Sequence, residues 1–280
     1  MVDNIKRLIS LWGIYAKLDL IWILRNLSLC VANILADVVS SLATVTGIFL
    51  LAQRFGEIGG MTKNQIIFML GYGCLIDGIR LMFFEMNNIS HISRIIGRGQ
   101  LDHKLIQPTP LWMQLLTEGF IPFSGSSMLL TGIAIIVYAS AKLNLAISLG
   151  VALQLIVFAL TSTLLILSIS YLFSCIAFYA PVAGEEVSTS AVGLFKRLKG
   201  FPLGGMPIAA QVILTTVLPI GLTAWYPANV LLDQKLALPN YLLIIITIIF
   251  VSITTIVFKK GLNHYGKKGS IRYSSRGHRR

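Results

Sequence analysis

The stretch "NYLLIIITIIFVSITTIVF", residues 240–258, contains no charged residue. An α-helix rises about 1.5 Å per residue, so about 20 apolar residues cross the hydrocarbon core of a bilayer. The whole chain of 280 residues is 55% hydrophobic and 12% charged, whereas soluble domains carry about 25% charged residues. The stretch therefore predicts a membrane-spanning helix, and the composition predicts an all-α integral membrane protein.

Five further apolar runs precede this stretch, and each is long enough to cross a bilayer. Their approximate bounds are residues 27–52, 66–86, 115–138, 145–180 and 206–224. The run at 145–180 exceeds a straight crossing, so we expect it to tilt or to extend into the cytoplasm as far as Pro181. We therefore expect a single transmembrane domain over residues 1–280, with an interfacial helix at 1–25, six spans within 27–258 and a basic tail at 259–280.

The segment before the first span, "DNIKRLISLWGIYAKLDLIWILR", has a helical period. Its apolar residues recur every three or four positions, and the lysines and arginines lie off that stripe. Two tryptophans suit the boundary between membrane and water. The pattern predicts an amphipathic helix on the cytoplasmic surface of the membrane.

Lysine and arginine gather in alternate connections, and cytoplasmic loops carry the excess of these residues. One side is expected to hold eighteen: Lys6, Arg7, Lys17, Arg25, Arg94, Arg98, Lys104, Lys196, Arg197, Lys199 and eight from Lys259 to Arg280. The other side holds Arg54, Lys63, Lys142 and Lys235. Both termini are therefore expected in the cytoplasm, with the basic tail near anionic lipid headgroups. The net charge of +12 follows mostly from this asymmetry and gives no reason to expect nucleic acid.

No catalytic, cofactor-binding or metal-binding residue is expected in this chain. The three cysteines lie in apolar runs and the four histidines are scattered. The stretch "GLNHYGKK", residues 261–268, departs from the phosphate-binding loop because Lys268 replaces the Ser or Thr that binds magnesium, and because it follows a membrane helix rather than a strand. We therefore expect no nucleotide hydrolysis by this chain.

Three ionisable residues lie within the expected spans: Asp37 in the first, and Asp77 and Arg80 in the second. A charge at the centre of a membrane helix costs about 2.5–3.5 kcal/mol on insertion scales. Asp77 and Arg80 are three positions apart, so they lie on one helix face and can offset part of that cost. Two interpretations are open: a polar translocation path or proton relay, and a structural ion pair at a buried helix contact.

The segment "LPIGLTAWYPANVLLDQ", residues 218–234, interrupts the apolar pattern before the sixth span. Pro219 and Pro227 each remove a backbone donor, and Trp225 and Tyr226 lie between them. Broken helix at membrane depth persists only where protein covers it or where it lines a cavity. The segment favours a re-entrant hairpin on the outer side, and the alternative is a span kinked by proline.

The longest polar interruption in the first half of the chain is "GRGQLDHKLIQPTPLW", residues 97–112. Gly97 and Gly99 permit a sharp reversal of the chain. A short helix is expected to follow, with Leu101, Leu105 and Ile106 on a narrow apolar face, and to be ended by Pro108 and Pro110. Such a helix suits docking into a groove of a partner protein, and the alternative is an ordinary basic loop.

Three motifs in this order resemble the permease subunits of type-2, exporter-class ABC transporters, in their six-span uncharacterised branch. They are "RGQLDHKLIQP" at 98–108, "VLPIGLTAWYPANVLL" at 217–232 and "FKKGLNHYGKKGS" at 258–270. The resemblance covers nearly the whole chain. The chain departs from the family at Phe258–Lys259–Lys260, where tryptophan and arginine are more common, and at Gln107, where arginine is.

The resemblance implies a permease in a prokaryotic plasma (inner) membrane, coupled to a separate ATPase subunit that holds ATP and magnesium. A second permease chain, identical or related, would complete the substrate path. The coupling signature falls on Arg98, Gly99, Leu101, Asp102, Leu105 and Pro108.

Two rival functions stay open. An ion- or proton-coupled secondary transporter would show matched broken helices in both halves, whereas this chain shows one broken segment. A membrane scaffold or regulator would need neither the segment at 97–112 nor the outer hairpin.

Overall fold

The structure, a computed structural model, describes residues 2–268 apart from 56, 85–91, 147, 234–238 and 240. Its regular secondary structure, within these described residues, is helical except for one small hairpin of two strands. The elements are α1 (Val2–Arg25), α2 (Leu27–Phe55), β1 (Glu57–Ile58), β2 (Met61–Thr62), α3 (Lys63–Phe84), α4 (Ile92–Gly97), α5 (Gln100–Leu105), α6 (Leu111–Thr117), α7 (Ser127–Lys142), α8 (Leu149–Ser174), η1 (Cys175–Phe178), α9 (Pro181–Leu198), α10 (Ile208–Thr216), η2 (Gly221–Thr223), α11 (Trp225–Leu231) and α12 (Leu242–Lys268).

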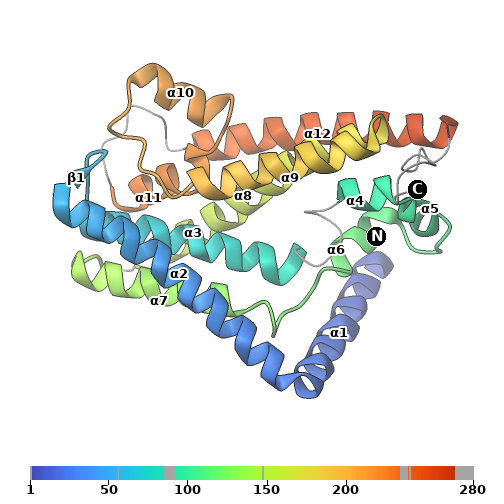
Figure 1. Ribbon diagram of the computed structural model, residues 1–280, viewed down its shortest axis with the longest axis horizontal. Helices are drawn as coiled ribbons and strands as arrows, with labels where there is room; N and C mark the ends of the chain where they lie inside the picture. The colour runs from blue at the N-terminus through green and yellow to red at the C-terminus, as the bar shows by residue number, and fades with distance from the viewer. Residues whose placement is uncertain are drawn as a thin grey trace.

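The long helices run between two distinct ends of the molecule (Figure 1). At one end, called here the hairpin end, lie β1, β2, α10 and α11. At the other, called here the α5 end, lie α4, α5, α6, the first turn of α1 and the last turns of α12. The chain therefore separates its short helices into two groups, with the long apolar helices between them.

Three helices of the described residues are long and apolar enough to cross a membrane: α3, α8 with its extension η1, and α12. The count rises to four if the bent pair α1–α2 forms one span. These two helices meet at 101°, measured between residues 4–25 and 27–40. A bend of that size is what a helix along the membrane surface needs when it leads into a crossing helix. The chain is therefore a multi-pass membrane protein.

Glycines allow α3 and α7 to approach each other closely. A Cβ added to Gly132 of α7 would lie 2.4 Å from the backbone nitrogen of Leu75, and one added to Gly78 of α3 would lie 2.3 Å from Leu129. Lipid provides no hydrophobic drive between helices, so small residues that let backbones approach are what hold membrane helices together. This contact fixes α3 at the centre of the fold.

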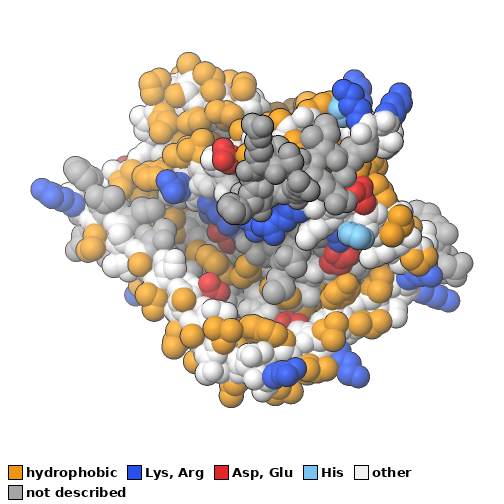
Figure 2. Space-filling view, turned by 45° about the vertical axis from the view of Figure 1, so that its right-hand side comes forward, with side chains coloured by type: hydrophobic (Ala, Val, Ile, Leu, Met, Phe, Trp, Pro, Cys, Tyr) orange, Lys and Arg blue, Asp and Glu red, His pale blue; other side chains and the backbone are white. Residues whose placement is uncertain are grey.

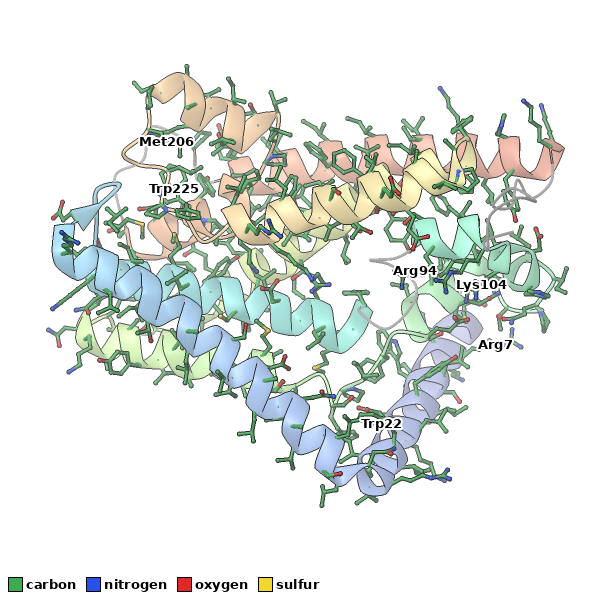
Figure 3. The ribbon with its side chains drawn as sticks, in the orientation of Figure 1. Arg7, Trp22, Arg94, Lys104, Met206 and Trp225 are labelled. Carbon is green, nitrogen blue, oxygen red and sulfur yellow. The ribbon has the colours of Figure 1, made fainter. Side chains whose placement is uncertain are left out.

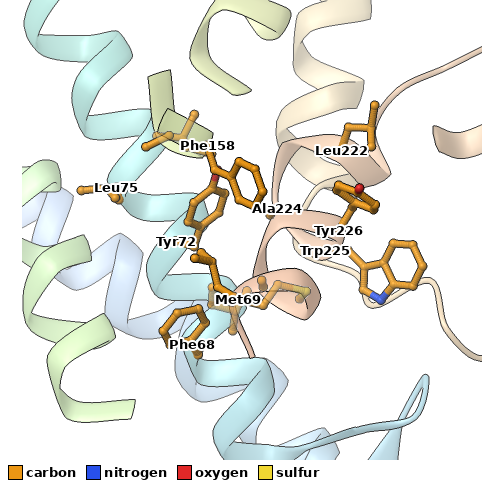
Figure 4. Packing of buried hydrophobic residues seen from close by; sticks show 14 of the residues in the cluster. Phe68, Met69, Tyr72, Leu75, Phe158, Leu222, Ala224, Trp225 and Tyr226 are labelled. Atoms are coloured by element: carbon orange, nitrogen blue, oxygen red, sulfur yellow. The ribbon is translucent and has the colours of Figure 1, made fainter. Parts of the chain in front are cut away.

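The main core lies between α3, α8 and the segment η2–α11 (Figure 4). The Tyr72 ring of α3 is fully buried there, and its hydroxyl lies 3.0 Å from the Ser162 hydroxyl of α8. Ser162 in turn donates to the carbonyl of Leu222 at 3.2 Å. The two polar groups are thus satisfied inside an apolar core, as buried polar atoms must be.

Two expected spans differ from the structure. The run at 115–138 is interrupted, because the chain turns between α6 and α7 at a segment with Gly119, Pro122 and Gly125. The run at 206–224 holds α10, whose nine residues extend about 14 Å and cannot cross a bilayer, followed by the short turn η2. The segment between the runs at 145–180 and 206–224, expected as a cytoplasmic connection, instead forms the helix α9, which packs against α8 beside the main partner of α8, α12. Residues 269–280 of the basic tail lie outside the described residues.

Lys196, Arg197 and Lys199 lie away from the α5 end, although the sequence predicts them on the same side of the membrane as Arg94, Arg98 and Lys104. They lie in the last turn of α9 and directly after it. This helix runs from the α5 end back toward the hairpin end (Figure 1). The Lys199 ammonium donates to the carbonyl of Gly73, at 3.2 Å, near the middle of α3. Lys199 lies here because its ammonium forms an ion pair with the carboxylate of Asp77, which is also on α3.

Candidate functional site

The expected short helix within residues 97–112 is present as α5. Gly99 precedes it with φ +70°, a left-handed conformation in which a side chain would be strained. The residues after Leu105 leave the helix, and Pro110 marks the start of α6. Figure 3 shows Arg94 and Lys104 at this end of the molecule, together with Arg7 of α1. The structure therefore contains the expected reversal and short helix, and the helix ends at Leu105, before the prolines.

The apolar face of α5 differs from the expectation. Leu101 is fully buried within its own chain, in a cluster with Ile95 of α4 and Phe178 of η1. Leu105 is 45% exposed and Ile106 is 81% exposed. The outward apolar surface of this segment, called here the outer face of α5, therefore consists of Leu105 and Ile106. The expectation that Leu101 presents this face is wrong, because its side chain anchors the helix to the protein.

Polar contacts hold the inner side of α5 to other elements. The Tyr265 hydroxyl of α12 donates to the Asp102 carboxylate at 2.8 Å. The Lys104 ammonium forms an ion pair with Glu118, and the Gln114 amide of α6 donates to the Lys104 carbonyl at 2.8 Å. Asp102 therefore faces its own chain. The sequence did not identify Tyr265 as its partner, although this tyrosine lies in one of the three quoted motifs.

An ion pair joins α4, directly before α5, to α9. The Arg94 guanidinium lies 2.9 Å from the Glu185 carboxylate, and the arginine side chain is 44% exposed. Of the remaining signature residues, Arg98 and Pro108 are exposed and Gly99 is buried. The short helices α4 and α5 are thus connected by side chains to α9 and α12, respectively.

The intramembrane charges Asp77 and Arg80 lie side by side, as their spacing predicts. Their closest charged atoms are 4.0 Å apart. The Asp77 carboxylate also forms an ion pair with Lys199, which the sequence analysis did not connect to it. The Asp77 and Lys199 side chains are only 16% and 12% exposed. This second pair links α3 to the end of α9, so Asp77 makes a contact between helices in addition to the contact within its own helix.

Asp37 lies in a different environment from Asp77. Its carboxylate accepts a hydrogen bond from the Ser127 hydroxyl at the start of α7, at 2.7 Å. It also lines a cavity of about 610 Å³ between α1, α2, α3 and residues 118–124. On the wall formed by α1, the Asp19 carboxylate accepts from the backbone N–H of Phe123 at 2.8 Å. The expected interfacial helix is therefore fixed to the bundle by a specific contact.

The segment with the two prolines is folded as the broken, protein-covered backbone that its sequence favoured. Pro219, Trp225, Tyr226 and Pro227 are all buried. The chain leaves α10, turns through η2 and enters the short helix α11, so a single kinked span is not what the structure contains. The Asn229 amide donates to the carbonyl of Trp225 at 2.8 Å, which helps to close this turn of helix.

Comparison with known proteins identifies the family. No curated protein and no solved structure matches the chain. Residues 38–269, most of the chain, match the family described as ABC-2 family transporter protein. That range includes α3, α5, the α10–α11 segment and α12. The chain therefore belongs to the ABC-2 transporter family and is a membrane permease of the ABC-2 type.

Proposed function

We propose that this chain is the membrane-spanning subunit of an ATP-driven exporter, moved by a separate ATPase subunit that docks on the outer face of α5. The observation that carries the proposal is the division of α5 into two sides. Leu101 and Asp102 bind it to its own chain, while Leu105 and Ile106 project apolar surface away from it. Adjacent apolar side chains on a short exposed helix suit docking into a groove of a partner protein.

Six crossings follow from the fold if α2, α3, α7, α8, α9 and α12 each pass through the membrane. The shortest are α7 and α9, with 16 and 18 residues, or about 24 and 27 Å of helix. A bilayer of about 30 Å accommodates such lengths by thinning locally. In this arrangement α10 and α11 form the outer re-entrant segment before the last span, and the α5 end lies in the cytoplasm.

The basic residues support this orientation of the α5 end. Lys6 and Arg7 begin α1 near it, Arg94 and Lys104 lie within it, and the last turn of α12 is basic. An excess of lysine and arginine marks the cytoplasmic side. We therefore place both termini in the cytoplasm of a prokaryotic cell and the chain in its inner membrane.

A second permease chain is the proposed neighbour of α9. Glu186, Lys196 and Arg197 of this helix are exposed in the single chain. Charged residues within membrane helices almost always face a bundle interior or a water-filled cavity. An exposed charged face in contact with lipid is therefore unfavourable, and a path shared with an identical or related second chain would cover it.

Mechanical coupling then follows from the side-chain contacts at the α5 end. ATP, with magnesium, would bind the ATPase subunits and draw them together, and the docked α5 would move with them. The Asp102–Tyr265 hydrogen bond passes that movement to α12, and the Arg94–Glu185 ion pair passes it to α9. Shifting a two-state equilibrium from 1:99 to 99:1 requires about 5.5 kcal/mol, so the transporter needs a firm contact at α5.

Co-purification tests this proposal. The full chain, tagged and extracted in a neutral detergent, should retain a protein that contains a phosphate-binding loop and hydrolyses ATP. A Lys142→Gln variant, changed at the end of α7 nearest the hairpin end, should retain the same protein. A folded chain that retains no ATPase under conditions that preserve the association of permease chains would contradict the proposal.

A further inference from the structure

A cavity of about 280 Å³, called here the basic pocket, opens beside the middle of α3. Its walls come from α2, α3, α7, the end of α9 and the start of η2–α11. Among its lining residues are Cys74 and Asp77 of α3 and three basic residues at the end of α9, Lys196, Arg197 and Lys199. Figure 2 shows lysine and arginine side chains gathered near the middle of one face, where that face is hollowed.

Positive charge exceeds negative charge among the described residues that line the basic pocket. Asp77 is the acidic lining residue, against the three basic residues of α9. The Asp77 carboxylate is already shared, because it pairs with Lys199 and lies 4.0 Å from a nitrogen of Arg80. A small hollow of about 10 Å³ behind it is lined by the same ion cluster and has room for about one water. The Arg197 and Lys196 side chains are exposed in the single chain.

This arrangement differs from a structural ion pair. One lysine would be enough to compensate Asp77, and each further cation within a membrane protein is costly unless it faces water or an anion. Arginine binds a carboxylate or phosphate group through two parallel hydrogen bonds, and lysine binds it as a point charge. A pocket with one sign of charge and walls of low dielectric constant also raises the local concentration of counter-ions.

We propose that the basic pocket binds an oxyanion, a phosphate or carboxylate group carried by the molecule that the transporter moves. This inference rests on the proposed function, since it assigns the class of substrate to that transport path. A phosphate group can belong to a lipid headgroup or to a solute, and both present the same chemistry to Lys196 and Arg197. The substrate is therefore an anionic molecule, and the basic residues of α9 are its charge-selecting contacts.

Cys74 provides a native probe inside the pocket. It is half-buried and lines the cavity, whereas Cys30 and Cys175 are buried elsewhere. The full chain in nanodiscs of neutral phosphatidylcholine is treated with two thiol reagents that differ in charge, the sulfonatoethyl and trimethylammonioethyl methanethiosulfonates. Each rate is divided by the rate with a free thiol in solution. Because both reagents attack the same thiolate, the ratio of the two rates does not depend on the fraction of thiolate.

The negative reagent should react with Cys74 about tenfold faster than the positive one, as expected for a cavity with one sign of charge. The double change Lys196→Gln with Arg197→Gln should remove most of this preference. The exposed Lys17→Gln change on α1 should leave it intact, and Cys74→Ser should remove the labelled peptide. Equal rates, or a faster positive reagent, would overturn the inference.

A second measurement identifies the source of the oxyanion. Cys74 is labelled with neutral iodoacetamide, either with inorganic pyrophosphate in solution or in nanodiscs that contain phosphatidylglycerol. Slowing of at least about threefold by pyrophosphate indicates a solute, and slowing only with phosphatidylglycerol indicates a lipid headgroup. The Lys196→Gln/Arg197→Gln variant should show neither effect. Labelling that is unchanged by both anions would refute the inference.

The outcome is separable from that of the proposed function. These measurements use the permease chain without an ATPase, so the charge preference does not depend on coupling. A strong preference in a chain that retains no ATPase would leave the pocket in place and contradict the exporter. A chain that retains an ATPase but shows no charge preference at Cys74 would support the exporter and contradict the oxyanion site.

Discussion

The ion pair between Asp77 and Lys199 should contribute more to stability than any other ion pair described in the chain. Both side chains are less than one-fifth exposed, so water and salt screen their attraction weakly. At an effective dielectric constant of about 20, two unit charges 4 Å apart attract by about 4 kcal/mol. Removing one partner of a buried pair costs about 3–5 kcal/mol, because the other charge stays buried and uncompensated.

A double-mutant cycle tests this magnitude. Asp77→Asn and Lys199→Gln alone should each destabilise the chain by about 3 kcal/mol. The two changes together should cost much less than the sum, giving a coupling energy of about 2–3 kcal/mol. The assay is denaturant unfolding of the purified chain in a neutral detergent. The matched control is the Arg94–Glu185 pair, whose arginine is 44% exposed, and exposed pairs contribute only about 0–1 kcal/mol.

Additive costs would refute the reasoning. If the Asp77–Lys199 coupling energy is below about 0.5 kcal/mol, the two charges do not meet in the folded chain. The end of α9 would then not lie against α3, and the basic pocket beside it would lose one wall. If the coupling energy only equals that of the Arg94–Glu185 control, the pair is solvated and does not stabilise the bundle.

Two further predictions concern packing and orientation. Gly132→Ala should lower the yield of folded chain severalfold, because the added Cβ would lie 2.4 Å from a backbone nitrogen of α3. The control Gly13→Ala should be tolerated, because its added Cβ would have no atom within 4 Å. The detergent-extracted yield and the unfolding midpoint measure both variants, and equal effects would contradict the close contact of α3 and α7. A single cysteine placed at Asn144 should react in intact cells with a thiol reagent that cannot cross membranes, and one placed at Gln100 should not, so the reverse pattern would overturn the orientation.

Length and composition were enough to predict several of the long apolar helices. The runs expected at 27–52 and 145–180 correspond to α2 and to α8 with η1. The last run ends earlier than α12, because its final turns carry lysines and leave the apolar pattern while the backbone stays helical. A pattern of apolar residues therefore predicts where a long helix lies better than where the helix ends.

The same criterion failed for α9 and α10. The α9 sequence "PVAGEEVSTSAVGLFKRL" carries two acidic and two basic residues, so its composition resembles a loop. The neighbouring run at 206–224 is apolar but contains Pro219, and its helix stops after nine residues. Contacts with other elements compensate Glu185 and Ser188 of the first, and protein covers the broken backbone that follows the second. Hydropathy along a single segment contains neither kind of information.

Pairings distant in the sequence limited the prediction of the site. The contact of Asp77 with Arg80 follows from spacing on one helix, but Lys199 is 122 residues away from Asp77. A helix as short as α5 has too few turns to show which apolar residue faces inward, so Leu101 and Leu105 could not be distinguished. The quoted motif at 258–270 contains Tyr265, but only the fold brings its hydroxyl to Asp102.

Loss of the outer face of α5 tests the central claim most directly. Leu105→Asp with Ile106→Asp should leave the chain inserted and folded, because both side chains are exposed, but should lower ATPase recovery in a pull-down at least tenfold. Burying unpaired charges in an apolar groove costs several kcal/mol, and tenfold corresponds to about 1.4 kcal/mol. The matched control, Met206→Asp with Leu149→Asp, alters two side chains that are 40% and 79% exposed and should retain the ATPase. Met206 lies beside α10 at the hairpin end (Figure 3), and Leu149 is the first residue of α8. Unchanged ATPase recovery and unchanged ATP turnover in the Leu105→Asp/Ile106→Asp complex would contradict the claim that α5 couples the permease to an ATPase.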